Sequence, residues 1–143
     1  MSDDPGRAAA AAAAAAADPT EATGAARAVR RWNDAGPDAV LLDGFHALKH
    51  ALRFGADVRV ALCADKAGTL RLAADLAPDL VEQLTERLTE VPAGVLRDLM
   101  ARVHPTAVAA LAARPSREAH LAALSARPRR APVVVLDNPR NLG

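Results

Sequence analysis

The fold is decided by the stretch Ala39-Val40-Leu41-Leu42-Asp43-Gly44-Phe45-His46-Ala47-Leu48-Lys49-His50-Ala51-Leu52-Arg53-Phe54-Gly55. Its first four residues are apolar and predict a strand, and Asp43-Gly44 predicts the turn that ends it. The residues from Phe45 to Phe54 predict a helix, because apolar side chains recur along one side at helical spacing. These apolar residues are Phe45, Leu48, Ala51 and Leu52. Gly55 suits the C-terminus of that helix, where left-handed backbone is common.

The opposite side of this predicted helix carries four basic or imidazole side chains and no acidic one. They are His46, Lys49, His50 and Arg53. Two interpretations stay open: a solvated surface, or a face that lies along the phosphates of a nucleic acid. His46 and His50 are also spaced to share a metal ion. No third ligand is nearby, so we predict no metal site.

The following residues alternate between strand and helix patterns. They predict a strand over 57–63, a loop over 64–69, a helix over 70–76, an apolar helical stripe over 80–88, a short strand over 88–91 and a helix over 94–102. Residues 107–113 stay ambiguous, because alanine favours helix while the flanking prolines favour a short strand. The order β-α-β-α-β-α-β predicts an α/β sandwich of about 75 to 80 residues. We place this domain at 37–115.

Two further segments flank the predicted domain. Residues 1–36 form a low-complexity, Ala-rich extension that we expect to be mostly disordered, since the run from Ala8 to Ala17 has almost no side chain to bury. Trp32 is interpreted as packing on the domain edge, with base stacking as the alternative. Residues 116–131 predict a basic connector with a helix capped by Ser116. The sequence predicts neither a signal peptide nor a membrane span.

The charges of the chain are nearly balanced overall but not along its length. There are 18 basic and 17 acidic residues, for a net charge of +1. From residue 101 onward the acidic residues are Glu118 and Asp137 alone, against seven arginines. That region is compatible with a polyanionic partner. The single cysteine, Cys63, excludes an intrachain disulfide and fits a reducing cytoplasm, and its apolar neighbours predict a buried thiol.

The sequence closes on Pro132-Val133-Val134-Val135-Leu136-Asp137-Asn138-Pro139-Arg140-Asn141-Leu142-Gly143. Val133 to Leu136 predicts a strand buried on both faces, as in a parallel sheet. The turn-forming residues behind it predict a loop of the kind that carries ligand sites in α/β proteins. Because a buried parallel strand needs neighbours, we expect this chain to be the front part of a larger protein.

Three stretches resemble the SpoU/TrmH-like RNA ribose 2′-O-methyltransferases of the SPOUT superfamily. The closing motif resembles the first motif of that family through Asp137, Asn138, Pro139, Asn141, Leu142 and Gly143. Residues 41–55 resemble the opening of its RNA substrate-binding domain, with Asp43 where Glu is commoner. Residues 104–112 resemble a strand of that domain, although the family's Gln-Gly pair is missing. The resemblance therefore implies that 107–112 is a strand.

The resemblance implies a fold and an activity. The fold is a small ribosomal-protein-like α/β sandwich, a linker, and from residue 132 the start of a truncated trefoil-knot (SPOUT) domain. The activity is transfer of the methyl group of S-adenosylmethionine to a ribose 2′-hydroxyl of rRNA or tRNA. The family's donor pocket lies beyond the first motif, so we expect no S-adenosylmethionine to bind this chain alone. Members of the family usually dimerise through the knotted domain, so the resemblance implies no dimer for this chain. Asn141 is the one catalytic candidate.

Two hypotheses of different classes follow. The chain is either the RNA-binding portion of such a methyltransferase or a stand-alone RNA-binding module. A small oligomerising α/β domain with a merely solvated basic face is a third interpretation. The predicted RNA-contacting residues are His46, Lys49, His50, Arg53, Arg114, Arg129, Arg130 and Arg140. The reading frame beyond Gly143 distinguishes the first hypothesis from the second.

Overall fold

The computed structural model describes residues 19–126, which form four strands, six α-helices and one 3-10 helix. They belong to two compact units, one reaching to Ala113 and the other beginning at Arg114. The first contains the whole sheet, and its order of strands and helices confirms the predicted alternation of an α/β protein. Among the described residues, no helix has both the length and the apolarity that crossing a bilayer requires.

The sheet is mixed and small. Its strands are β1 (Ala39–Asp43), β2 (Val58–Cys63), β3 (Leu88–Glu90) and β4 (Val108–Ala113), in the spatial order β1-β4-β2-β3. The last strand in sequence lies between the first two and pairs antiparallel with both, whereas β2 and β3 are parallel. The ambiguous segment 107–113 is therefore a central strand, as the family resemblance implied.

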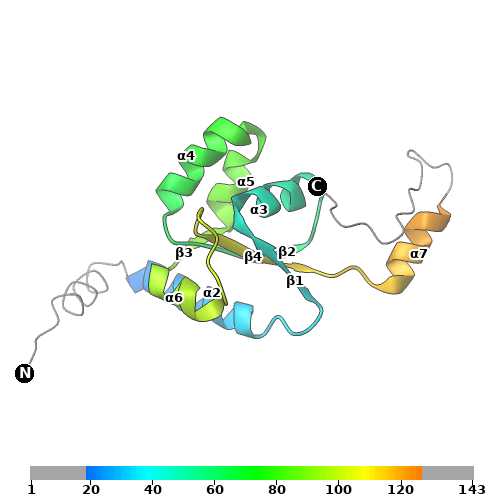
Figure 1. Cartoon of the computed structure of the whole chain (residues 1–143), viewed down its shortest axis with the longest axis horizontal. Coiled ribbons are helices and arrows are strands. Elements are labelled where there is room, and N and C mark those ends of the chain that lie inside the picture. The colour runs from blue at the N-terminus through cyan, green and yellow to red at the C-terminus, as the bar shows by residue number, and fades with distance from the viewer. Residues whose placement is uncertain (1–18, 127–143) are drawn as a thin grey trace, which may run out of the picture. The chain divides into compact units, whose positions relative to one another are not determined.

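Helices cover both faces of this sheet (Figure 1). On one face lie α3 (Gly44–Arg53), α4 (Lys66–Leu76), the 3-10 helix η1 (Pro78–Leu80) and α5 (Val81–Arg87). On the other lie α2 (Pro19–Asn33) and α6 (Ala93–Leu99). Each face has its own hydrophobic cluster. Burial on both sides explains why β2 and β4 are nearly continuous apolar runs rather than alternating ones.

The side chains of the central strands are divided between these two clusters. Along β4, Val108 and Ala110 lie in the cluster beneath α3, whereas Ala109 and Leu111 lie in the cluster of α2 and α6. In β2 a register shift between Val58 and Val60 breaks the simple alternation. An extra residue in one strand turns the following side chains to the other face. For this reason Val58 lies in the cluster beneath α3 and Val60, two residues later, lies in the cluster of α2 and α6.

Helix α2 differs from the sequence analysis, which placed it inside an extension expected to be mostly disordered. The helix packs on the sheet: Ala28 is completely buried, and Ala25, Val29 and Trp32 are partly buried around it. These four positions follow helical spacing, and the small alanines let the helix approach the strands closely. The preference for Trp32 as a packing residue agrees with this placement.

Helix α4 begins earlier than predicted, so the expected loop over 64–69 is wrong. Two carboxylates satisfy the free N–H groups of its first turn. Asp65 accepts a hydrogen bond from the Gly68 N–H at 2.8 Å, and Glu90 accepts one from the Lys66 N–H at 2.7 Å. Acceptors at a helix N-terminus stabilise it. The Asp65 cap is a local signal that the sequence analysis overlooked, whereas Glu90 is 24 residues from Lys66 and no local pattern indicates it.

The second unit contains α7 (Arg117–Ser125). Ser116 caps it as predicted, because its Oγ accepts a hydrogen bond from the Ala119 N–H at 3.1 Å. The apolar side chains of Leu121 and Leu124 are about half exposed.

Candidate nucleic-acid interface

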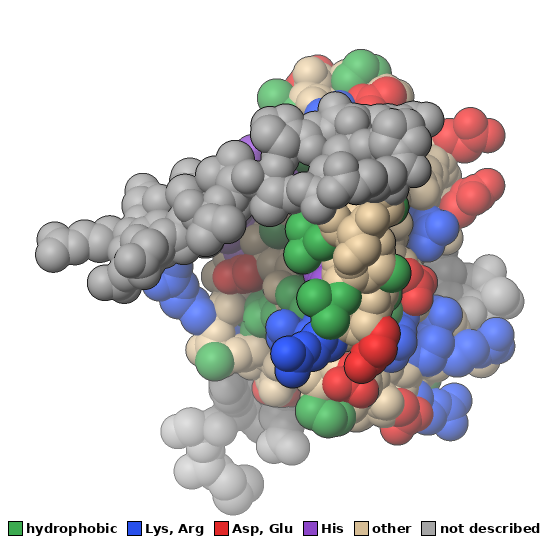
Figure 2. Space-filling model, turned by 90° about the vertical axis from the view of Figure 1, so that its right-hand side faces the viewer, with side chains coloured by type: hydrophobic (Ala, Val, Ile, Leu, Met, Phe, Trp, Pro, Cys, Tyr) green, Lys and Arg blue, Asp and Glu red, His purple; other side chains and the backbone are tan. Residues whose placement is uncertain are grey.

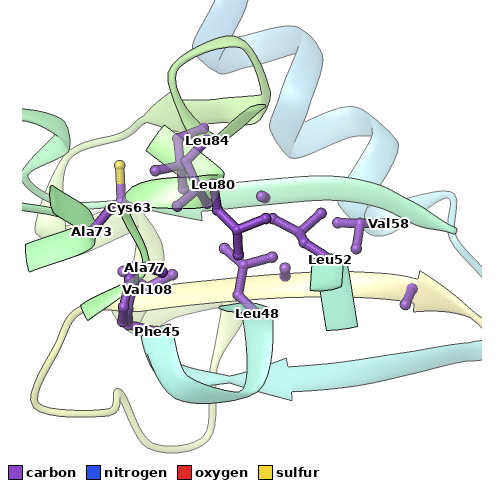
Figure 3. Close-up of a cluster of buried hydrophobic side chains, with 14 residues drawn as sticks. Phe45, Leu48, Leu52, Val58, Cys63, Ala73, Ala77, Leu80, Leu84 and Val108 are labelled. Carbon is purple, nitrogen blue, oxygen red and sulfur yellow. The ribbon is translucent and has the colours of Figure 1, made fainter. Parts of the chain in front are cut away.

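Helix α3 divides its side chains between the core and the surface as the sequence predicts. Figure 3 shows Phe45, Leu48 and Leu52 directed into the cluster that they share with Leu80 and Leu84. Leu48 is fully buried and Phe45 is 2% exposed. This anchoring fixes the rotation of the helix about its axis. The polar side of α3 must therefore face away from the sheet.

Three of the four predicted RNA-contacting side chains on α3 are available on that polar side. His46 is exposed, and Lys49 and His50 are half-buried. The rings of His46 and His50 lie edge to face, with their centroids 4.4 Å apart. Desolvation lowers the pKa of His50, and the neighbouring positive charges of His46, Lys49 and Arg53 lower it further. Both effects favour the uncharged form of the His50 ring.

Arg53, the fourth of these residues, is engaged in an ion pair. Its Nε and Nη2 donate to the two carboxylate oxygens of Asp79, at 2.9 and 2.5 Å. The hydrogen bond raises the pKa of Arg53 and lowers that of Asp79. The helix itself has no acidic residue on this side, but η1 supplies one. Arg53 thus connects α3 to η1 and contributes less free positive charge than the sequence suggested.

The turn before α3 is held by a contact between distant segments. Gly44 has φ +87°, and a Cβ at this position would lie 2.7 Å from the His104 ring. The Thr106 hydroxyl accepts a hydrogen bond from the Phe45 N–H at 3.0 Å. Only glycine fits here, because both the backbone conformation and the space exclude a side chain.

His104 and Thr106 form a local hydrogen-bond chain that supports this turn. The Thr106 N–H donates to Nδ1 of His104 at 3.2 Å, so that Nδ1 is an acceptor. The Thr106 hydroxyl, 2.9 Å from the same nitrogen, therefore donates to it and is left to accept from Phe45. Ala107 follows with φ +46° and leads into β4. We call residues 104–106 the hook. It positions the first turn of α3.

Of the other predicted site residues, only Arg114 lies within the described part of the chain. It is exposed and belongs to the second unit. Asn141, Arg129, Arg130 and Arg140 lie outside the described residues, as does the strand predicted over 133–136. The structure therefore brings together the α3 residues and does not test the rest of the predicted site.

Sequence reasoning missed two features of this surface. One is the hook. The other is Phe54, which is 83% exposed and stacks on His50, with ring centroids 6.0 Å apart and an interplanar angle of 14°. Phe54 lies four residues after His50, so helical spacing placed it on the polar side. Because Phe54 is apolar, it was not counted among the side chains of the polar side.

The charges on the surface are mixed rather than uniform. On the face seen in Figure 2, Lys and Arg side chains lie beside Asp and Glu side chains. Among the described residues, no group of three His, Cys, Asp or Glu side chains is placed to hold a metal ion. His46 and His50 thus have no third ligand in the described part of the chain. What distinguishes the polar side of α3 from the rest of the surface is the row of His46, Lys49 and His50, not an excess of positive charge.

No family model, curated protein or solved structure matches this chain.

Proposed function

We propose that this chain is the RNA-binding portion of an S-adenosylmethionine-dependent RNA ribose 2′-O-methyltransferase, and that the polar side of α3 lies along the RNA backbone. The observation that carries the proposal is the row His46, Lys49 and His50 on an anchored helix. Lysine and imidazole groups on a rigid element suit phosphate contacts, which fix orientation without reading sequence.

The contact between Gly44 and the hook adds support. Residues 41–55 and 104–112 were singled out separately for their resemblance to one substrate-binding domain. In the structure the two segments meet, through the Gly44–His104 packing and the bond from Phe45 to Thr106. They also pair along β1 and β4, where Leu41 is opposite Leu111. Two motif segments that build one feature are a stronger argument than either alone.

Binding of structured RNA by the full chain tests the RNA-binding part of the proposal. A tRNA or an rRNA stem-loop labelled with a fluorophore is titrated at several salt concentrations, and heparin is titrated as an unrelated polyanion. We expect RNA to bind more tightly than heparin, with affinity falling as salt rises because counterions are released. Equal affinity for both polyanions contradicts specific RNA recognition.

Two variants of equal charge locate the contact. Lys49→Ala removes a positive charge from α3, and Arg97→Ala removes one from α6, on the other face of the sheet. Both side chains are accessible to solvent. Lys49→Ala should weaken RNA binding and reduce the salt slope by about 0.7, the value for one lost single-strand phosphate contact. Arg97→Ala should leave both quantities unchanged; equal effects of the two variants argue against α3.

The methyltransferase part of the proposal makes a separate prediction. In the family resemblance, the methyl donor binds beyond the motif that begins at Asp137, and Asn141 is the catalytic candidate. Residues 1–143 should therefore show no saturable heat when titrated with S-adenosylmethionine. Micromolar donor binding by this chain contradicts the assignment of these residues to substrate binding.

A further inference from the structure

Phe54 is an unusual residue for this surface. The sequence contains two Phe, one Trp and no Tyr. Phe45 is buried in the core and Trp32 is partly buried where α2 packs on the sheet, whereas Phe54 is 83% exposed. No other large apolar side chain of the described residues is more exposed than Phe54. An aromatic side chain left in water gains no burial energy in the folded monomer, so packing does not explain it.

The backbone holds Phe54 in a defined place. The Ala56 N–H donates to the Ala51 carbonyl at 2.8 Å, and the Gly55 N–H donates to the Leu52 carbonyl at 3.1 Å. With Gly55 at φ +74°, this is the Schellman ending of a helix. Phe54 is the last residue before that glycine, so its Cα–Cβ direction is fixed by hydrogen bonds on both sides. Because this backbone is already ordered, little backbone entropy is lost when the ring binds a ligand.

The neighbours of Phe54 complete an aromatic column along α3. The rings of His46, His50 and Phe54 follow one another at four-residue spacing, with successive centroids 4.4 and 6.0 Å apart. The lowered pKa of His50 favours the uncharged ring next to Phe54. Lys49 lies on the polar side of the same helix, whereas Arg53, which precedes Phe54 directly, is paired with Asp79. An exposed aromatic ring on a helix that also carries a lysine complements a nucleobase and a phosphate of the same strand.

We propose that Phe54 is a stacking platform for an unpaired base of the RNA, with Lys49 contacting the adjacent phosphate. This inference rests on the proposed function and specifies its ligand: single-stranded or looped RNA rather than continuous duplex. Bases in a duplex are stacked on one another and present no free face to a protein ring. A single exposed ring also differs from the contiguous apolar patch of a protein-docking site.

The test compares two RNAs of the same stem, one with an unpaired loop and one closed as a blunt duplex, by fluorescence anisotropy with the full chain. Phe54→Leu keeps an apolar side chain but removes the aromatic face, and Phe54→Ala removes both. Leu76→Ala is the matched control, because Leu76 is a 54% exposed apolar residue at the end of α4. Circular dichroism confirms that each variant is folded.

We expect both Phe54 variants to lose about 5- to 150-fold in affinity for the looped RNA. The affinity of both Phe54 variants for the duplex should stay within twofold of the wild-type value, and their salt slope should be unchanged. The affinity of the Leu76→Ala protein for either RNA should also stay within twofold of the wild-type value. Unchanged loop binding by Phe54→Leu, or an equal loss on loop and duplex, overturns the stacking platform while the proposed function stands. If the wild type binds neither RNA, the proposed function and this inference both fail.

Discussion

Gly44→Ala should destabilise the protein more than a glycine replacement of similar backbone conformation elsewhere. An added Cβ would lie 2.7 Å from Cγ and Nδ1 of the His104 ring, closer than real Cβ contacts. The residue must also keep φ near +87°, which costs an L-residue about 1–2 kcal/mol. The ring must then move, which disturbs the hydrogen bonds that hold Thr106, each worth about 0.5–1.5 kcal/mol. The sum predicts a loss of about 2–5 kcal/mol.

The structure supplies matched controls for this prediction. Gly36 and Gly55 also have positive φ, at +68° and +74°, but nothing lies within 4 Å of an added Cβ at either position. Gly36→Ala and Gly55→Ala should therefore show only the backbone cost of about 1–2 kcal/mol. The free energy of unfolding is measured by urea denaturation of each variant, with a common slope as evidence for two-state behaviour.

A double-mutant cycle separates strain from steric conflict. In a His104→Ala background the ring is gone, so Gly44→Ala should cost no more than Gly55→Ala does. If Gly44→Ala costs the same in both backgrounds, the contact between residue 44 and the hook carries no energy. That result would refute our account of how the first turn of α3 is positioned.

Three other predictions concern charge, thiol chemistry and packing. Arg53 lowers the pKa of Asp79, so the pair stabilises the fold at pH values above the pKa of Asp79 in the unfolded chain. This contribution is lost as the pH falls through the pKa of Asp79 in the folded protein. The difference in unfolding free energy between wild type and Asp79→Asn, measured with urea, should therefore shrink below about pH 4. Burial raises the pKa of Cys63 to about 11, so the native thiol should react with a disulfide reagent at pH 8 far more slowly than the urea-unfolded chain; equal rates contradict its burial. Ala28→Leu should cost about 1–3 kcal/mol by overpacking α2, whereas Ala26→Leu on the exposed side should be nearly neutral; equal unfolding energies show that α2 does not pack as described.

The local parts of the fold were predictable because they depend on neighbouring residues. The strand, turn and helix of 39–55 follow from spacing and from the special conformations of Gly44 and Gly55. The cap of α7 by Ser116 is equally local. By contrast, residues 108–113 form a strand only because β1 and β2 flank them, so alanine's helix preference gave no reliable signal.

The candidate site was predictable in part for the same reason. Periodicity placed His46, Lys49 and His50 on one side of a helix, which needs no knowledge of the tertiary fold. The partner of Arg53 comes from 26 residues away, and the hook is 61 residues from Phe45. Contacts at such separations are set by packing of the whole sheet. No pattern within a short window reports them.

NMR of the ¹⁵N-labelled full chain shows residue by residue whether RNA contacts α3. Addition of a looped RNA should shift and broaden the amide signals of residues 46–54. Those of α6, on the opposite face of the sheet, should stay in place. Shifts concentrated on α6 or spread evenly over both faces would contradict the account.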